Sequence, residues 1–156
     1  MVDVLISSVR PVDVGEILTL QRAAYVTEAQ LYSDASLPAL TQTYEELAAE
    51  LRSDPALKAT MGQRIVGSVR ARLKGSVLHI GRLMVAPDLQ GRGIGTRLLT
   101  AVEREAAGEV DRYMLFTGHL SHANIRLYER RGYTPIRRAQ LNSDMVLIHL
   151  EKQADK

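Results

Sequence analysis

A glycine-rich segment near the middle of the chain is the part of the sequence best suited to bind a ligand. It reads Gln90-Gly91-Arg92-Gly93-Ile94-Gly95-Thr96 and lies where an expected strand gives way to an expected helix. Glycines let the backbone turn tightly, and the first turn of a helix offers N–H groups without partners and the positive end of the helix dipole. The segment therefore predicts an anion site, with a plain strand-to-helix turn as the alternative.

Two well-known phosphate motifs do not fit this segment. A Walker A loop requires Gly-Lys-Ser or Gly-Lys-Thr, and neither occurs in the chain. The dinucleotide motif of a Rossmann fold requires Gly-x-Gly-x-x-Gly in its first βα unit, whereas Gly91, Gly93 and Gly95 are spaced Gly-x-Gly-x-Gly and follow a run of strands. The sequence thus disfavours a P-loop ATPase or kinase and a nicotinamide enzyme.

Several side chains are candidates for acid–base chemistry or substrate contact. Asn124 and Tyr128 are four residues apart and therefore share one face of a helix. His79 has an ordinary pKa near ~6.5, which suits a base, although a histidine on a half-buried strand face is the simpler interpretation. Glu28 is the second candidate base or else a surface carboxylate. Thr117 is a candidate substrate contact or a plain strand-end threonine.

Composition excludes several other chemistries. The chain has no cysteine, so disulfides, thiolate metal sites and cysteine nucleophiles are ruled out. His119 and His122 have no carboxylate nearby in the sequence, so no metal site is predicted. Aromatic residues make up 4% of the chain and the formal net charge is only +2. Binding to nucleic acid is therefore disfavoured, because it needs a concentrated basic face with stacking aromatics.

The elements that position these residues follow from apolar periodicity and turn signals. Strands are expected over residues 4–9, 56–60, 64–73, 77–85, 113–117, 133–139 and 145–150. Helices are expected after Asp13, from Thr43 to before Pro55, from the glycine segment to near Gly108, and over residues 121–131. Asp13 with Glu16, and Thr43 with Glu46, have the spacing of capping boxes. Residues 30–42 are expected to form a loop.

These elements predict one α/β domain over residues 1–150, followed by a frayed polar tail over residues 151–156. The length of 156 residues, with 46% hydrophobic and 24% charged residues, suits a single globular core. Short turns near residues 61–63 and 74–76 predict an antiparallel meander inside a mixed sheet, which argues against a doubly wound fold.

Two motifs resemble the GNAT superfamily of N-acetyltransferases. Gln90-Gly91-Arg92-Gly93-Ile94-Gly95, preceded by Leu83-Met84-Val85-Ala86-Pro87, is similar to that family's Gln/Arg-x-x-Gly-x-Gly/Ala signature. Asn124-Ile-Arg-Leu-Tyr128-Glu-Arg-Arg-Gly132-Tyr133, with the spacing Asn-x-x-x-Tyr-x-x-x-Gly-Tyr, is similar to the Asn-, Tyr- and Gly-Phe/Tyr-containing helix of that family. The resemblance implies a mixed, mostly antiparallel central sheet of about seven strands with helices on both faces.

The resemblance also implies roles for particular residues. Main-chain groups of Gln90 to Thr96 would wrap the pyrophosphate of acetyl-CoA, and Arg92 would add charge near it. Met84 and Val85, at the end of a splayed strand, would pair with the amides of pantetheine. Asn124 would contact the pantetheine arm. Tyr128 would be the general acid for the leaving thiolate, and Tyr32 would line the acceptor pocket.

The leading hypothesis is an N-acetyltransferase that uses acetyl-CoA and a primary amine. The amine would attack directly in a ternary complex, because no cysteine is present to form an acyl-enzyme. The alternatives are a non-catalytic acyl-CoA binding or sensing module, motivated by the missing glutamate in the strand around His79, and an interaction protein without a cofactor. The acceptor amine is a small molecule or a peptide, and residues 30–42 could build a pocket for either. We also expect a cytoplasmic protein without a membrane segment and consider a homodimer through the last strands.

Overall fold

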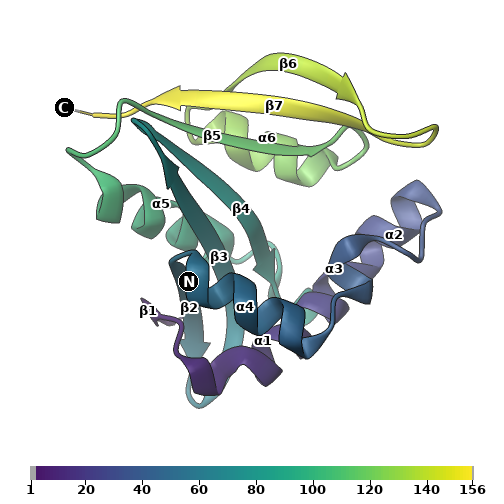
Figure 1. The fold of residues 1–156 in the computed structure, drawn as a ribbon, viewed down its shortest axis with the longest axis vertical. Helices are drawn as coiled ribbons and strands as arrows, with labels where there is room; N and C mark the ends of the chain where they lie inside the picture. Colours follow the sequence, from purple (N-terminus) through teal and green to yellow (C-terminus); the bar gives the residue numbers. More distant parts are fainter. Residues whose placement is uncertain (1–2, 156) are drawn as a thin grey trace.

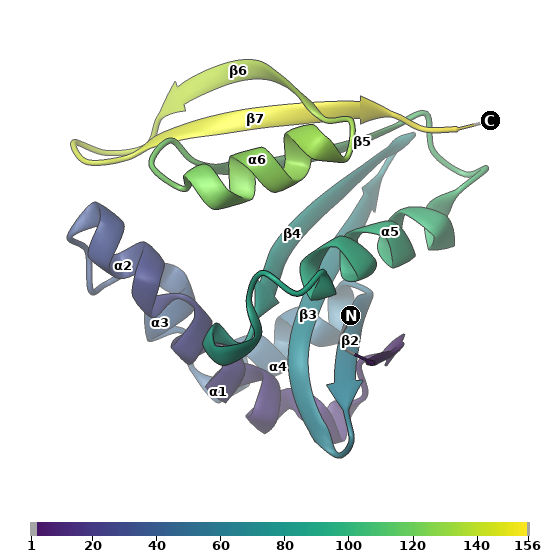
Figure 2. The same ribbon diagram turned by 180° about the vertical axis from the view of Figure 1, so that it is seen from behind.

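The computed structural model describes residues 3–155, which form one mixed sheet covered by helices on both faces (Figures 1 and 2). The strands are β1 (Leu5–Ser8), β2 (Ala56–Met61), β3 (Arg64–Lys74), β4 (Val77–Val85), β5 (Arg112–Gly118), β6 (Thr134–Gln140) and β7 (Val146–Gln153). The helices are α1 (Val14–Ala24), α2 (Val26–Tyr32), α3 (Pro38–Thr41), α4 (Tyr44–Ser53), α5 (Ile94–Ala106) and α6 (His122–Arg130), with 3-10 turns η1 (Pro11–Asp13) and η2 (Pro87–Leu89).

The sheet has seven strands in the order β1-β2-β3-β4-β5-β7-β6. Strands β1 to β4 form an antiparallel meander, and β5, β7 and β6 are also paired antiparallel. Among the described strands, β4 and β5 form the one parallel pair. The expected fold class, a mostly antiparallel mixed sheet with helices on both faces, is confirmed.

The two halves of the sheet separate at the β4–β5 junction. β4 pairs with β5 only through Val77, Leu78 and His79, opposite Arg112 to Met114. Beyond His79 the two strands diverge, and Figure 1 shows the opening between them. From Ile80 onward, the edge of β4 that faces β5 therefore has no neighbouring strand. After Met114, the edge of β5 that faces β4 has none either.

Helices cover the two sheet faces unequally. Helices α1 and α4 pack together on one face of the first half, while α5 and α6 lie on the opposite face, seen in front in Figure 2. The main core lies between these layers and includes Ile17, Val66, Leu98, Leu99 and Leu150, each at most 2% exposed. No helix within residues 3–155 is long and apolar enough to cross a membrane.

Local signals placed most of these elements correctly. Glu46 donates its backbone N–H to the Thr43 hydroxyl, and the Thr43 N–H donates to the Glu46 carboxylate, so the expected capping box is present at the start of α4. The two expected turns of the meander contain Gly62 and Gly75, both with positive φ. At these positions a side chain would strain the backbone.

Three sequence expectations are wrong. Residues 30–42 are not a loop throughout, because α2 continues to Tyr32 and α3 adds one helical turn. β7 runs to Gln153 and pairs with β5, so the polar residues after Leu150 do not form a tail from residue 151 onward; Lys156 lies outside the described residues.

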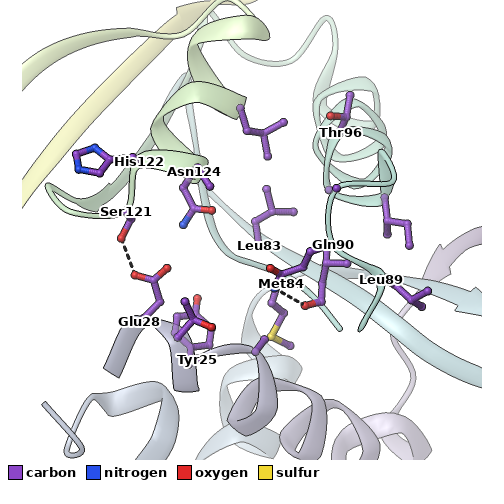
Figure 3. Close-up of a pocket in the computed structure, with 18 of the residues that line it drawn as sticks. Tyr25, Glu28, Leu83, Met84, Leu89, Gln90, Thr96, Ser121, His122 and Asn124 are labelled. Atoms are coloured by element: carbon purple, nitrogen blue, oxygen red, sulfur yellow. Dashed lines mark hydrogen bonds between the residues drawn. The ribbon is translucent and has the colours of Figure 1, made fainter. Parts of the chain in front are cut away.

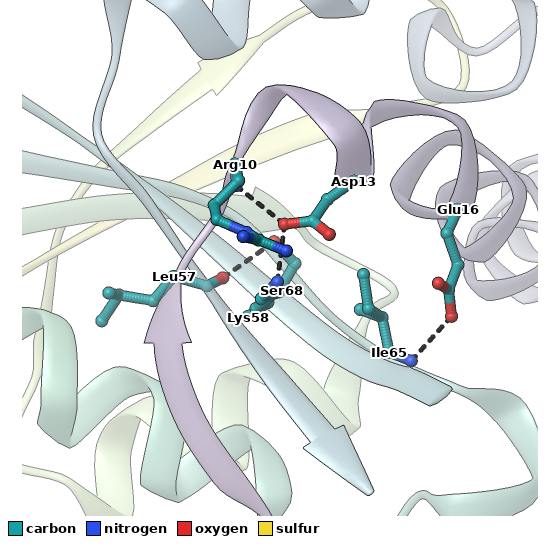
Figure 4. Close-up of polar contacts among 7 residues, drawn as sticks. All are labelled: Arg10, Asp13, Glu16, Leu57, Lys58, Ile65 and Ser68. Carbon is teal, nitrogen blue, oxygen red and sulfur yellow. Dashed lines mark hydrogen bonds and ion pairs between the residues drawn. The ribbon is translucent and has the colours of Figure 1, made fainter. Parts of the chain in front are cut away.

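The third wrong expectation is the capping box of Asp13 and Glu16. The Asp13 carboxylate instead accepts from the Arg10 N–H at 2.7 Å and from Lys58 Nζ at 2.6 Å. The Glu16 carboxylate accepts from the Ile65 N–H at 2.7 Å (Figure 4). Both carboxylates therefore connect α1 and the turn before it to the sheet. Contacts with distant residues override the local pattern.

Candidate active site

A cavity of about 550 Å³ lies where β4 and β5 diverge (Figure 3). One side is formed by the end of α1 and by α2, and the other by the first turns of α5 and α6. The polar residues and glycines that line it are Tyr25, Thr27, Glu28, Gln90, Gly91, Gly93, Gly95, Thr96, Ser121, His122, Asn124 and Arg130. The cavity thus joins the glycine segment to a carboxylate from the amino-terminal helices.

The glycine segment presents free main-chain donors to this cavity. Gly91 and Gly93 have φ values of 77° and 85°, which bend the chain sharply before α5. The first helical bond of α5 runs from the Arg97 N–H to the Gly93 carbonyl at 3.1 Å. Within residues 3–155, no hydrogen bond is found for the N–H groups of residues 91–96. A row of such donors at a helix start is suited to a diphosphate.

The segment's side chains differ in their placement. Ile94 and Thr96 line the cavity with the glycines, whereas Arg92 is exposed and does not line it. Gln90 donates from Nε2 to the Val85 carbonyl at 3.2 Å, which connects the segment to the end of β4.

The end of β4 forms a second binding surface. Met84 and Val85 line the cavity while pairing on their other edge with Ser68 and Gly67 of β3. The register of this pairing shifts at a bulge in β4, where Arg82 and Leu83 lie opposite Val69 of β3; the φ of 51° at Arg82 is in the left-handed region. Because the edge toward β5 is unpaired, main-chain groups of β4 are available to an extended, amide-bearing ligand.

A hydrogen-bond chain holds the Glu28 carboxylate at the cavity wall. Ser121 Oγ donates to Glu28 Oε2 at 2.5 Å. The Tyr32 hydroxyl lies 2.8 Å from Ser121 Oγ and accepts from the Leu120 N–H at 2.9 Å. Because an ionised carboxylate only accepts, the Ser121 proton is directed to Glu28 and the Tyr32 proton to Ser121. The chain joins α2 to the start of α6 across the opening between the strands.

Tyr32 is therefore not where the sequence predicted it. It is only 3% exposed, does not line the cavity and has its hydroxyl fully engaged. Its ring packs in a small second core with Leu37 and Met145, which docks α2. Space for the ring comes from Gly118, where an added Cβ would lie 2.0 Å from the Tyr32 hydroxyl oxygen.

Tyr128 is enclosed beside the cavity. Its side chain is 6% exposed and does not line the cavity. Asn124 and Leu127, on the same helix, do line it. Burial raises the pKa of Tyr128, and the nearby Tyr25 hydroxyl and Glu28 carboxylate raise it further. The phenol is therefore neutral at physiological pH and keeps a proton that it can donate. The two groups that act on this pKa, the Tyr25 hydroxyl and the Glu28 carboxylate, both belong to residues that line the cavity.

Two other predicted site residues lie away from the cavity. His79 is in the short paired region of β4 and β5, four residues before the first cavity-lining residue of that strand. Burial and the neighbouring cations Lys74, Arg72 and Arg112 lower the pKa of His79. Thr117 is 8% exposed, and its Oγ1 accepts from Asn124 Nδ2 at 3.4 Å. Thr117 therefore orients Asn124 and does not line the cavity.

Sequence reasoning missed Tyr25, Ser121 and His122 as cavity residues. Tyr25 precedes Glu28 by three residues, a spacing that places both on one helical face and could have revealed it. Ser121 and His122 begin α6, and nothing in their local sequence indicates that α2 lies opposite. His119 does not line the cavity, and its Nδ1 accepts from the Val146 N–H at 3.0 Å. Within the described residues, no group of three or more potential metal ligands is assembled.

Comparisons with known proteins agree with this architecture. The sequence model of the Acetyltransferase (GNAT) family matches residues 17–133. A search of curated proteins finds no match to the chain. Among solved structures, the ribosomal-protein-S18-alanine N-acetyltransferase of Escherichia coli is 16% identical, with a TM-score of 0.80 over 99% of this chain and 96% of that one.

Two further structures contain the cofactor. The PaiA N-acetyltransferase of Thermoplasma acidophilum, in complex with coenzyme A, is 14% identical, with a TM-score of 0.79 over 97% of this chain and 99% of that one. The YncA structure of Salmonella typhimurium, with acetyl-CoA, is 17% identical, with a TM-score of 0.77 over 99% of this chain and 95% of that one. At these identities the likeness demonstrates a shared fold.

Proposed function

The chain belongs to the GNAT acetyltransferase family, and from this premise we propose that it transfers an acetyl group from acetyl-CoA to a primary amine. The two substrates react in one ternary complex. The observation that carries this proposal is one cavity that joins the unpartnered amides of residues 91–96, the unpaired edge of β4 and the Glu28 carboxylate.

Acetyl-CoA would be held by main-chain groups. The pyrophosphate accepts hydrogen bonds from the amides of residues 91–96, where the positive end of the α5 dipole also favours it. The pantetheine arm extends along Met84 and Val85 as a substitute strand, and Asn124 contacts it from α6. Arg130 at the cavity wall adds a positive charge for the phosphates. This arrangement directs the thioester toward the space between Glu28 and Tyr128.

The reaction requires three proton transfers. A free amine attacks the thioester carbonyl carbon, but a lysine-like amine has a pKa near ~10.4 and must first lose a proton. Glu28 accepts that proton directly or through water, with its geometry maintained by Ser121. When the C–S bond breaks, the neutral Tyr128 phenol donates its proton to the CoA thiolate, and the extra proton on the attacking nitrogen then passes to the Tyr128 oxygen, which restores the phenol. The products are the amide and free CoA.

Glu28→Gln tests the base assignment. Loss of a general base typically costs about 10²- to 10⁴-fold in rate, so kcat should fall by that order while the Kd for acetyl-CoA changes little. The assay measures release of CoA thiol with a panel of amines across pH. Glu45→Gln is the matched control, because Glu45 is an exposed carboxylate of α4 outside the cavity. Equal loss in both variants would contradict the assignment.

A non-catalytic acyl-CoA sensor is the second candidate, favoured by the enclosure of Tyr128 at 6% exposure. Tyr128→Phe separates the two functions. Acid catalysis predicts that Tyr128→Phe lowers kcat with unchanged acetyl-CoA affinity, whereas a sensor shows no turnover with any amine before or after the change. Acetyl-CoA at a hundredfold excess over Kd should stabilise either protein by about 2.7 kcal/mol, measured by thermal unfolding. No stabilisation would refute both candidates.

A further inference from the structure

One face of the sheet carries a concentration of positive charge that the acetyl-CoA site does not use. It is the face on which α4 packs, and Figure 1 shows that no helix covers it over β5, β7 and β6. We define the basic sheet face by its six cationic residues, Arg70, Arg72, Lys74, Arg82, Arg112 and Arg137.

Strand register places these residues on one side. Arg72 is directly opposite His79, which is opposite Met114 on β5. Two residues further along β5, Phe116 is opposite His149, and His149 is opposite Arg137. The His149 ring lies 5.5 Å from the Phe116 ring. The face therefore combines cations at its borders with an apolar centre.

Part of the positive charge is neutralised, and most is not. Arg70 forms an ion pair with Glu50 of α4, and Arg112 lies 4.0 Å from Glu151. The other four cations have no carboxylate among the ion pairs found within residues 3–155. Burial lowers the pKa of His149, and the neighbouring Arg137 lowers it further. Burial and the neighbouring cations lower the pKa of His79 in the same way. Both shifts are consistent with a positive local potential.

The basic sheet face borders the cavity along both diverging strands. On the β4 side, the Arg82 guanidinium lies 5.7 Å from the centre of the Tyr25 ring, and Tyr25 lines the cavity. On the β5 side, Phe116 is two residues before Gly118, against which Tyr32 of α2 packs. A chain lying on the face would thus reach the Glu28 end of the cavity, opposite the glycine segment that is assigned to acetyl-CoA.

We propose that the basic sheet face docks an acidic segment of a peptide or protein acceptor whose amine enters the cavity. This inference rests on the proposed acetyl transfer and names its substrate class. Carboxylates of the acceptor would pair with Arg72, Lys74 and Arg137, and apolar side chains would contact Phe116, which is 57% exposed. Complementary charge of this kind raises the association rate and selects the partner.

A second copy of the chain fits this face less well, because two such faces would bring like charges together. Single-stranded nucleic acid also fits poorly, because it needs successive aromatic platforms for its bases. Phe116 is the one Phe, Tyr or Trp residue that the register places on this face.

The test compares two synthetic peptides that differ only in charge. Each has a free amino terminus, no lysine and a carboxy-terminal fluorophore; one has a run of glutamates after its first residues and the other has glutamines there. We expect a KM about tenfold lower for the glutamate peptide at low salt, with the difference shrinking as salt screens the charges. Anisotropy of the fluorophore measures binding independently of turnover.

Charge-reversal variants locate the effect. Arg72→Glu combined with Lys74→Glu should remove the preference for the glutamate peptide, while turnover of benzylamine and the KM for acetyl-CoA stay unchanged. Arg104→Glu is the matched control, because Arg104 is an exposed cation on α5, on the opposite face of the sheet. The control should retain the preference.

The outcomes separate this inference from the proposed function. Equal KM values for the two peptides, or a preference that survives the charge reversal, would overturn acidic docking even if amines are acetylated. A dimer in light scattering that the reversal disrupts would also overturn it, because the face would then join two copies. Charge-dependent binding of the glutamate peptide without acetylation of any amine would support docking and refute the transferase.

Discussion

Replacing Gly118 with alanine should break the contact that docks α2 beside the cavity. The new Cβ would lie 2.0 Å from the Tyr32 hydroxyl oxygen and 2.5 Å from Cζ. Carbon contacts this short do not occur, so the Tyr32 ring must leave its place. Its hydroxyl then loses the Leu120 N–H and Ser121 as partners.

The expected cost follows from these losses. A buried donor left without a partner costs about 1–3 kcal/mol, and partial exposure of a ring that is now 3% exposed adds about 1–2 kcal/mol. Gly118→Ala should therefore lower the free energy of unfolding by about 2–5 kcal/mol. The rate of acetyl transfer should fall as well, because Ser121 no longer holds Glu28 in a single position.

A double-mutant cycle measured by urea unfolding tests the cause. In a Tyr32→Ala background the obstruction is gone, so adding Gly118→Ala should cost less than about 0.5 kcal/mol. Gly81→Ala is the control, because no atom lies within 4 Å of its added Cβ and its φ is not positive. If Gly118→Ala costs the same in both backgrounds, or nothing in the wild type, the role assigned to the Tyr32 contact is refuted.

Three further predictions concern ligand binding, pH and the core. Gly93→Val forces a side chain into φ +85°, so it should raise the acetyl-CoA Kd at least tenfold by titration calorimetry while costing about 1–2 kcal/mol of stability. Burial alone would raise the pKa of Asp13, but hydrogen bonds from Lys58 and Arg10 hold it below its usual value. Because the pKa of Asp13 is lower in the folded state than in the unfolded state, its ionised carboxylate stabilises the fold at pH values above the unfolded-state pKa. This stabilisation is lost as the pH falls through the folded-state pKa, so Asp13→Asn should flatten the loss of stability measured below about pH 4. Tyr133→Phe removes the 2.6 Å hydrogen bond to the buried Glu103 carboxylate and should cost about 1–3 kcal/mol in denaturant unfolding.

The sequence alone was sufficient for features that depend on neighbouring residues. The spacing of Gly91, Gly93 and Gly95 predicted a sharp turn with free amides before α5, and the Thr43–Glu46 capping box predicted the start of α4. Apolar runs and the turn residues between them located the seven strands of residues 3–155. Each of these depends on dihedral preferences and hydrogen bonds within a few residues, and the chain order is enough to specify them.

Features that depend on contacts between distant residues were decided only by the tertiary structure. Tyr32 and Ser121 are 89 positions apart, and nothing near Tyr32 indicates that its hydroxyl would be engaged at the start of α6. His79 and Thr117 looked like site residues in the sequence, yet the point at which β4 and β5 separate leaves both outside the cavity. Sequence patterns therefore identified the chemical groups, but the divergence of two strands determined which groups meet, because side-chain proximity across a sheet depends on register and packing.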